Sequence, residues 1–547
     1  MDPLATPAVD VPTTVEQAAR YRTVALFVER AAAVDLGFSL TDDNASDIAA
    51  ICARLDGLPI ATELAAARIK VLAPGELLTR LEQRLPVLKG GARDLPARQQ
   101  TLRDTIAWSH DLLPPDQQAA FRRLGVFVGG WTLKAAERVA GDPDGDEVVD
   151  HLASLINNGL VRREETSDAS RFRLLETVRD YALERLAATG EVQSTRAAHA
   201  RYFHGLGQRA EGELHGPRMR WWHSLLETEH PNLRAALHWF GSTGETEREL
   251  QLAIALAPFW YHRAHQREGA DWLEDAVRRS GGADALLRAD ALAWVSHLTN
   301  SSRVERSRAA ARASRVLAED AGDPVAIAHA LYAQSVAEGW FGGDLSGGIA
   351  VAERAVSLHD REGGRPPWFR GHLIGDLGAM LILAGERERG IALVEDAVAY
   401  HLGESQLWGA GLKLCELGLA AHQVGEARRA TEQYRAGLEL IWGVRDPTNV
   451  YHGMTGISGL AADMGHHETT ARLLGAVAGI EERSGASVHP PFRPIQEAAR
   501  SSAKRKLGAA YDLAFAAGRS LPLELAVAEA LRIADEFTAH QNRDEPR

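Results

Sequence analysis

Six lysines are the residues that could hold a nucleotide phosphate, and their neighbours argue against that role. A Walker A loop ends in Gly-Lys-Ser/Thr because backbone amides cradle the phosphates, the lysine neutralises them and the hydroxyl binds Mg²⁺. No lysine here has Gly before it or Ser/Thr after it, and no apolar run ending in paired acids precedes residue 54. We therefore expect no catalytic residues, no enzyme activity and no cofactor, with ATP or ADP bound only if a P-loop core is supplied elsewhere. The lysines are Lys70, Lys89, Lys134, Lys413, Lys504 and Lys506.

Histidines and cysteines are the next candidates, as metal ligands. A helical zinc site places ligands at i, i+4 or beside a carboxylate. His466, His467 and Glu468 lack the HExxH spacing and suit a solvated turn, while His489 precedes two prolines and suits a rigid loop. Cys52 and Cys415 lie far apart with no CxxC spacing, which fits a reducing cytoplasm. No metal site is predicted.

Composition narrows the classes of protein. At 547 residues the chain should hold several domains. A net charge of −13 disfavours general nucleic-acid binding. No apolar run approaches the length of a membrane span, and the N-terminus lacks the basic and apolar regions of a signal peptide. We expect a cytoplasmic protein with no membrane partner.

Residues 54–68, RLDGLPIATELAAAR, form the most informative motif. Gly57-Leu58-Pro59 ends one helix, and Pro59 suits the first turn of the next; alone, the tripeptide would also suit a plain joint between helices. The segment resembles the GLPLAIELAAAR motif of bacterial STAND NTPases, relatives of the NB-ARC ATPases. The resemblance implies a helical lid behind a P-loop core, with Gly57, Leu58 and Pro59 as the remnant of an adenine-contact motif. LFVERA at 26–31 resembles the element that follows that core.

Further matches follow in the family's order. Residues 94–112 resemble the linker into a winged helix, and helices are predicted at 116–124, 133–140 and 146–157. Wing strands are predicted at 160–165 and 170–175. A closing helix ending at Gly190 resembles the family's ETIRxYAxERLA segment. LLETEHPNLRAALHWF at 225–240 resembles its LExEHxNLRAALxW helix.

The winged helix suggests DNA binding, but its third helix carries Asp146, Glu147 and Asp150 and no cation. Phosphate contacts supply much of the affinity for DNA, and Arg162 and Arg163 on the wing do not replace them. DNA binding by this chain is therefore not expected. In NB-ARC relatives the domain clamps the nucleotide through a Met-His-Asp triplet. Leu174, Leu175 and Glu176 stand at those positions, which disfavours an ADP clamp.

A repeat follows beyond residue 280. Gly343, Gly385, Gly425 and Gly465 each open a turn that leads into an amphipathic helix, with spacings of about forty residues. This pattern is typical of tetratricopeptide-like helix pairs, which stack and offer a concave surface.

The chain is similar to the C-terminal part of an actinobacterial STAND/NB-ARC-like ATPase transcriptional regulator of the LuxR/AfsR type, without the P-loop core. SLPLELAVAEALRIADE at 520–536 resembles the helix before that family's terminal helix-turn-helix, which is also not seen. The expected fold is mainly α: a lid remnant, a winged helix with a small β-wing, and a tetratricopeptide-like α-solenoid. The predicted parts are a tail and helix from the core edge (1–33), the lid-like bundle (34–93), the winged helix (94–190), a helical linker (191–280), the repeats (281–538) and a tail (539–547).

The function predicted is that of a regulatory, signal-sensing or protein-interaction module, with a protein partner or small effector on the repeats and possibly a separate NTPase core as partner. Two alternatives stay open: an ATP/ADP-binding transcriptional regulator whose P-loop segment is encoded upstream or in another chain, and a purely structural helical scaffold. If the core is missing, Val24, Phe27, Leu58 and Pro59 should be partly exposed, and residues 1–14 should be frayed.

Overall fold

The computed structural model divides into two compact units, residues 1–203 with 231–236, and residues 204–230 with 237–547. It describes residues 4–7, 13–35, 37–55, 57, 59–70, 72–83, 102–111, 113–141, 148–158, 160–165, 170–282, 284–362, 367–484 and 487–541. It is mainly α-helical, with one small sheet in the described residues, as the hydrophobic periodicity predicts.

The first unit begins with a helical bundle. It consists of α1 (Val15–Ala18), α2 (Arg22–Val34), α3 (Ala45–Arg54), α4 (Pro59–Ala66), the 3₁₀ turn η1 (Ala67–Lys70) and α5 (Pro74–Gln83). Helix α2 packs on α4 and η1, which leaves Val24 and Phe27 fully buried. The expected exposure of these two side chains is therefore wrong, because the bundle covers them itself. Pro59 is half-buried, and Leu58 lies outside the described residues.

A winged helix completes this unit. It contains α6 (Leu102–Asp111), α7 (Pro115–Leu124), β1 (Trp131–Thr132), α8 (Leu133–Val139), α9 (Val148–Asn157), β2 (Arg162–Glu165), β3 (Ser170–Arg173) and α10 (Glu176–Thr189). The wing strands pair antiparallel, with Arg163 opposite Phe172. Strand β1, which was not predicted, adds to the other edge of β3 in the order β1-β3-β2. Its Trp131 is buried and stacks on Phe127, and this packing explains the extra strand.

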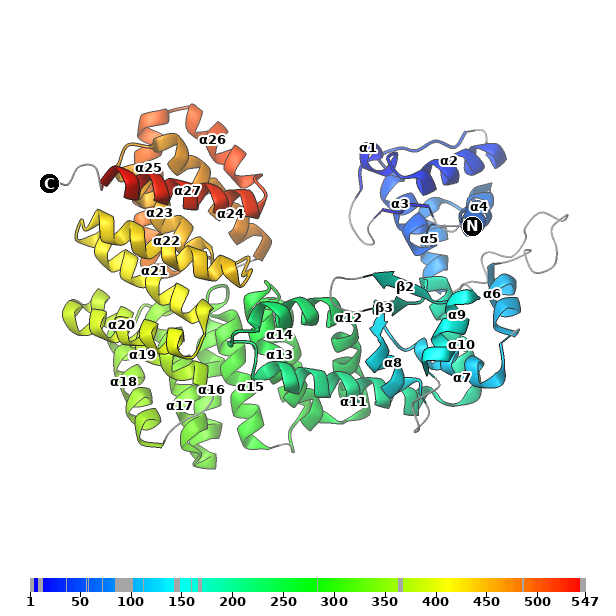
Figure 1. Ribbon diagram of the computed structural model, residues 1–547, viewed down its shortest axis with the longest axis horizontal. Helices are drawn as coiled ribbons and strands as arrows, with labels where there is room; N and C mark the ends of the chain where they lie inside the picture. Colours follow the sequence, from blue (N-terminus) through cyan, green and yellow to red (C-terminus); the bar gives the residue numbers. More distant parts are fainter. Residues whose placement is uncertain are drawn as a thin grey trace. The chain divides into compact units, whose positions relative to one another are not determined.

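The second unit is an α-solenoid of antiparallel helix hairpins (Figure 1). After α11 (Val192–Glu211) and α12 (Met219–Thr243), which contribute to both units, it contains these elements in chain order: α13 (Thr246–His262), α14 (Gln266–Arg279), α15 (Ala285–Thr299), α16 (Val304–Ala321), α17 (Pro324–Ser335), the π-helix η4 (Val336–Phe341), α18 (Leu345–Glu362), α19 (Pro367–Ala384), α20 (Arg387–Gly403), α21 (Leu407–Gln423), α22 (Ala427–Gly443), α23 (Tyr451–Asp463), α24 (His467–Ser484), η5 (Pro490–Phe492), α25 (Arg493–Leu507), α26 (Ala510–Arg519) and α27 (Leu523–Gln541).

The predicted repeat glycines all lie at helix ends in this unit. Gly343, Gly385, Gly425 and Gly465 have φ of 78°, 96°, 77° and 83°, a left-handed conformation that favours glycine. Each lies just before an outer helix of a hairpin: α18, α20, α22 or α24. The hairpin packing also extends N-terminal of residue 281, since α13 packs on α14 and α14 packs on α15.

Candidate functional site

The Gly57 motif contacts the chain's own N-terminal segment. The Leu4 amide donates to the Gly57 carbonyl at 2.8 Å, and the Thr23 hydroxyl donates to the Ala5 carbonyl at 2.5 Å. Gly57 has φ of 66°, and a Cβ there would lie 2.1 Å from the Leu4 carbonyl oxygen. Residues 4–7 are therefore docked rather than frayed, and Gly57 is needed both for its conformation and for this close approach.

In the winged helix, the surface of α9 carries little that could contact DNA. Val149 is 53% exposed, and Asp150, Ala153 and Asn157 are also exposed. Asp146 and Glu147, on which the sequence argument also relied, lie outside the described residues. Arg173 on the wing pairs with Glu164 at 2.8 Å. The described part of α9 thus exposes one acid, an apolar side chain and no cation.

Asn232, from the helix motif at 225–240, holds the loop before β1. Its Oδ1 accepts from the Val128 amide at 2.7 Å, and its Nδ2 donates to the Gly130 carbonyl at 2.9 Å. The Nε2 atom of His199 lies 3.2 Å from the same Oδ1. Because Asn232 is fully buried and these three bonds serve the loop and one histidine, its role here is structural.

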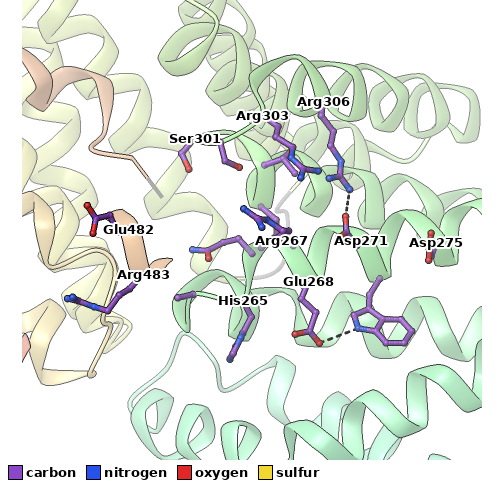
Figure 2. Close-up of a pocket in the computed structure, with 16 residues that line it drawn as sticks. His265, Arg267, Glu268, Asp271, Asp275, Ser301, Arg303, Arg306, Glu482 and Arg483 are labelled. Atoms are coloured by element: carbon purple, nitrogen blue, oxygen red, sulfur yellow. Dashed lines mark hydrogen bonds and ion pairs between the residues drawn. The ribbon is translucent and has the colours of Figure 1, made fainter. Parts of the chain in front are cut away.

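In the second unit, an open cleft of about 740 Å³ lies beside α14, the α15–α16 turn and α24 (Figure 2). Some of its charged side chains have partners on neighbouring helices. Arg306 donates to Asp271 at 2.9 Å and to Glu274 at 2.5 Å, and Trp272 donates to Glu268 at 3.3 Å. The cleft is polar and accessible.

A narrow chamber lies among the inner helices of the solenoid. Two cavities of about 100 and 60 Å³ have five lining side chains in common: Tyr261, His297, Tyr332, His372 and Trp408. The π-helix η4 contributes Val336, Trp340 and Phe341 to the lining. Its wider turn departs from α-helical spacing at this point, and such turns recur at functional sites.

A buried ionic cluster forms one wall of the chamber. Lys413 is 1% exposed, and its Nζ contacts Asp376 Oδ1 and both carboxylate oxygens of Glu416, at 2.9 and 3.0 Å. The Tyr332 hydroxyl donates to Asp376 Oδ2 at 2.8 Å. Burial would lower the pKa of Lys413, but the two carboxylates raise it above its ordinary value. Burial, with Asp376 nearby, raises the pKa of Glu416 to about 7 despite the lysine.

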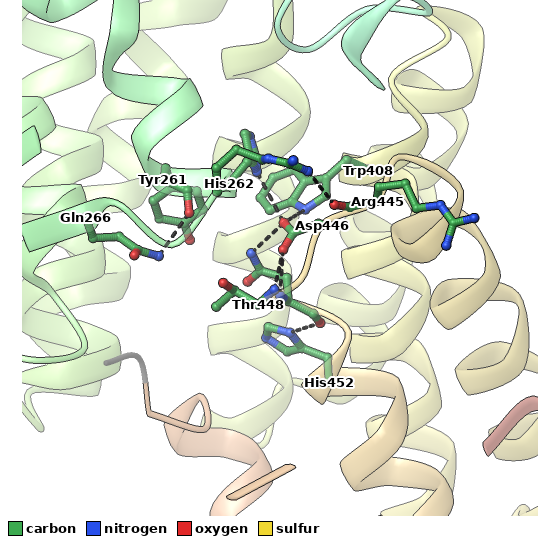
Figure 3. Close-up of polar contacts among 10 residues, drawn as sticks. Tyr261, His262, Gln266, Trp408, Arg445, Asp446, Thr448 and His452 are labelled. Carbon is green, nitrogen blue, oxygen red and sulfur yellow. Dashed lines mark hydrogen bonds and ion pairs between the residues drawn. The ribbon is translucent and has the colours of Figure 1, made fainter. Parts of the chain in front are cut away.

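A second network closes the chamber around Asp446 (Figure 3). The Trp408 indole donates to Asp446 Oδ2 at 2.8 Å, and the amides of Thr448 and Asn449 donate to Oδ1, each at 2.8 Å. His262 Nδ1 lies 3.4 Å from Oδ2. The neighbouring Arg263 donates to the Arg445 carbonyl at 3.0 Å. Residues about 180 positions apart thus meet, and the solenoid curls until α13 contacts the α22–α23 turn.

The chamber histidines are neutral. Burial lowers the pKa of His297 to about 3 and that of His452 to about 4, and it lowers the pKa values of His372 and His489 well below their ordinary range. His297 Nε2, His489 Nδ1 and the Trp340 indole nitrogen are buried and have no hydrogen-bond partner within the described structure. Such unmatched polar atoms are costly unless something else contacts them.

The sequence analysis did not predict this chamber: it named Lys413 only to exclude a Walker lysine and His489 only as part of a rigid loop, and it named none of the other lining residues. They come from alternate helices at separations of about forty residues, with no local motif. One signal was available: Lys413 is the only lysine between Lys134 and Lys504, and in the segment LWGAGLKLCELGLAAHQ it and Glu416 interrupt a largely apolar run. A charged residue at such a place marks a buried pair or a site.

One comparison with known proteins identifies a domain within the first unit. Residues 113–187 match the winged helix-turn-helix domain family. A protein named as an HTH-type transcriptional regulator in Mycobacterium tuberculosis is 40% identical over 328 residues, which cover 58% of this chain and 37% of that protein. An uncharacterized protein of Mycobacterium bovis is 39% identical over 182 residues, 33% of this chain and 46% of that protein. The chain therefore spans less than half the length of these relatives.

Among solved structures, a STAND protein with a tetratricopeptide repeat sensor from Pyrococcus horikoshii is 12% identical, with a TM-score of 0.42 over 97% of this chain and 74% of that one. In the described part of the chain, no helix is both long enough and apolar enough to cross a membrane.

Proposed function

We propose that this chain is a regulatory, non-catalytic module whose solenoid senses a small ligand in the narrow chamber. The observation that carries the proposal is the combination, in one cavity, of a buried lysine–carboxylate cluster with aromatic rings and unmatched polar atoms. The regulator named among the relatives supports a regulatory role.

The charges favour a ligand with a positive charge. One lysine, Lys413, faces the carboxylates of Asp376 and Glu416, and Asp446 lies at the closing network. The neutral histidines add no positive charge. Trp408, Tyr261 and Tyr332 line the same cavities, and aromatic rings can make cation–π contacts. A small organic amine matches this lining better than an anion, because the lining carries more acids than cations, and better than a protein segment, because the cavities are small.

Ligand binding would act through the closure of the solenoid. Trp408 both lines the chamber and donates to Asp446, which joins the α22–α23 turn to α13. A ligand that contacts Trp408 would therefore change the stability of the contact that closes the solenoid. Differential affinity for the closed form is what a sensor requires.

The test is a thermal-shift screen of small amines against the full chain, followed by calorimetry of the hits. We expect hits to lose at least about tenfold in affinity in Tyr332→Phe and His297→Phe, equivalent to about 1.4 kcal/mol. His238→Phe, on an exposed histidine, is the matched control and should bind like the wild type. Hits that are anionic, or that bind all variants equally, would contradict the chamber assignment.

A second candidate, DNA binding, is raised by the winged helix-turn-helix match. We propose that the winged helix serves packing rather than base reading, since the described part of α9 exposes no cation and wing residue Arg173 is paired. A gel-shift of the full chain on mixed duplex at low salt should show no retardation. Salt-sensitive retardation that disappears in the double variant Arg162→Ala/Arg163→Ala would instead show that the wing binds DNA.

A further inference from the structure

Two short sequence patterns face each other at the start of the solenoid. Glu227 and His230 are three residues apart on α12, and His265 and Glu268 are three residues apart at the start of α14. Residues at i and i+3 share one face of a helix. The sequence analysis singled out neither pair, because each alone is an ordinary helix-surface pattern.

The fold brings these four side chains together. His265 Nε2 lies 3.2 Å from Glu227 Oε1, and His230 Nε2 lies 3.4 Å from Glu268 Oε1. Ligand atoms of Glu227, His230 and His265 all lie within 4.8 Å of one another. The imidazole rings of His230 and His265 are 4.6 Å apart between centroids. Two ligands on one tetrahedral zinc ion are separated by about 3.3 Å, so both short contacts already have the length of a coordination edge.

The turn before α14 holds His265 in place. Ala264 has φ of 63°, in the left-handed region that favours glycine, and the His265 amide donates to the Trp260 carbonyl at 3.0 Å. Arg263 contacts Glu227 Oε2 at 3.4 Å, which orients that carboxylate with Oε1 toward His265. Groups outside the cluster thus fix the positions of its members, as second-shell partners do in metal sites.

Carboxylates lie beside both imidazoles of the cluster. The His230 side chain is 6% exposed, and its Nε2 lies 3.4 Å from Glu268 Oε1. The Trp260 indole N–H also lies 3.4 Å from this nitrogen, so an ion bound by Nε2 would displace that long contact. The two negative charges of Glu227 and Glu268 in a partly buried site favour a cation.

We propose that Glu227, His230, His265 and Glu268 bind one divalent transition metal of the Zn²⁺ type. Two imidazoles and two carboxylates suit zinc and its neighbours, whereas Mg²⁺ and Ca²⁺ prefer all-oxygen sets. His265 and Glu268 also line the open cleft beside α14, which provides an entry path for the ion (Figure 2). The ion would tie α12 to the start of α14.

The experiment uses the full chain, freed of any histidine tag and of bound metal, titrated with Zn²⁺ by calorimetry and with Co²⁺ by visible absorption. We expect one equivalent to bind, with the intense bands of a four-coordinate Co²⁺ site. His230→Gln and His265→Gln should each weaken binding at least about tenfold. Circular dichroism checks that each variant is folded, and Glu268→Gln gives a milder change at the same site.

His422→Gln is the matched control. His422 also contacts a carboxylate, Asp463, at 2.8 Å, but it is not part of the three-ligand cluster found in the described residues. Its variant should bind metal like the wild type. The proposal is wrong if the wild type takes up neither ion, or if His422→Gln weakens binding as much as His230→Gln does.

Discussion

The histidines of the two units are satisfied in different ways. In the first unit His110, His151 and His199 each have a hydrogen-bond partner: Asp111, Asp116 and Asn232. In the second unit His297, His401 and His489 each keep one buried nitrogen without a partner in the described structure, and both nitrogens of His223 are in that state. The first arrangement is that of a finished core. The second is expected where an additional molecule or ion completes the contacts.

Breaking the ionic cluster should have the largest effect. Lys413→Met leaves Asp376 and Glu416 buried without a cation, which should cost about 3–5 kcal/mol of unfolding free energy. Chemical denaturation measures the loss, and hydrogen exchange should place it in α17–α23. Lys506→Met, on an exposed lysine, should stay within about 0.5 kcal/mol of the wild type. If both variants lost the same unfolding free energy, the buried cluster around Lys413 would contribute no more stability than an exposed lysine.

Acid should destabilise the second unit. His401 and His452 have pKa values of about 4 in the folded chain, below the ordinary 6.5, so between these pH values the unfolded chain binds more protons. Stability is therefore lost as pH falls through that window, by up to about 3 kcal/mol per histidine. Glu416, with its pKa raised to about 7, acts in the opposite direction between 7 and its ordinary 4.5. The stability lost through several histidines is expected to exceed the stability gained through one glutamate, so the net effect of acid is destabilising.

The measurement is the denaturation midpoint between about pH 7 and pH 4. His297→Phe should flatten the profile, because it removes a group whose pKa is about 3 when folded. It should cost little at neutral pH, since the nitrogen it removes has no partner. A wild-type profile that is flat, or that rises on acidification, would falsify the assignment of neutral chamber histidines.

A smaller effect is expected in the first unit from Asn232→Ala. The change leaves the Val128 amide and the Gly130 carbonyl without their buried partner, at a cost of about 2 kcal/mol. Asn158→Ala is the control, because Asn158 is exposed and bonds only to the Ser154 carbonyl of its own helix. Thermal unfolding should separate the two variants. If they unfold at the same temperature, Asn232 is not the structural residue described above.

The smallest expected effect concerns Gly57. Gly57→Ala should cost about 1–2 kcal/mol and release residues 4–7, because the new Cβ would meet the Leu4 carbonyl. Gly190→Ala has a similar φ of 76° but no atom within 4 Å of the added Cβ, so it carries the conformational cost alone. Hydrogen exchange at the Leu4 amide reports the difference. Equal protection in both variants would show that the N-terminal segment is held by other contacts.

Local patterns determined the elements of this protein. The Gly-initiated repeats, the wing strands and the order of the winged-helix segments follow from hydrophobic periodicity and turn residues that act over a few positions. Gly343, Gly385, Gly425 and Gly465 could be placed because only glycine takes the left-handed conformation there without cost. The burial of Val24 and Phe27 could not be predicted from the sequence, because it depends on how α2 packs against α4 and η1.

Only the tertiary structure decided where chemistry gathers. Lys413, Asp376 and Tyr332 belong to different hairpins and meet because the inner helices of neighbouring hairpins stack, whereas the curl of the solenoid brings His262 to Asp446. Glu227 and His230 become candidate ligands only when α14 places His265 and Glu268 beside them. Periodicity specifies which face of each helix is buried. It does not specify which faces meet, because the curvature of a solenoid is the sum of many small packing rotations.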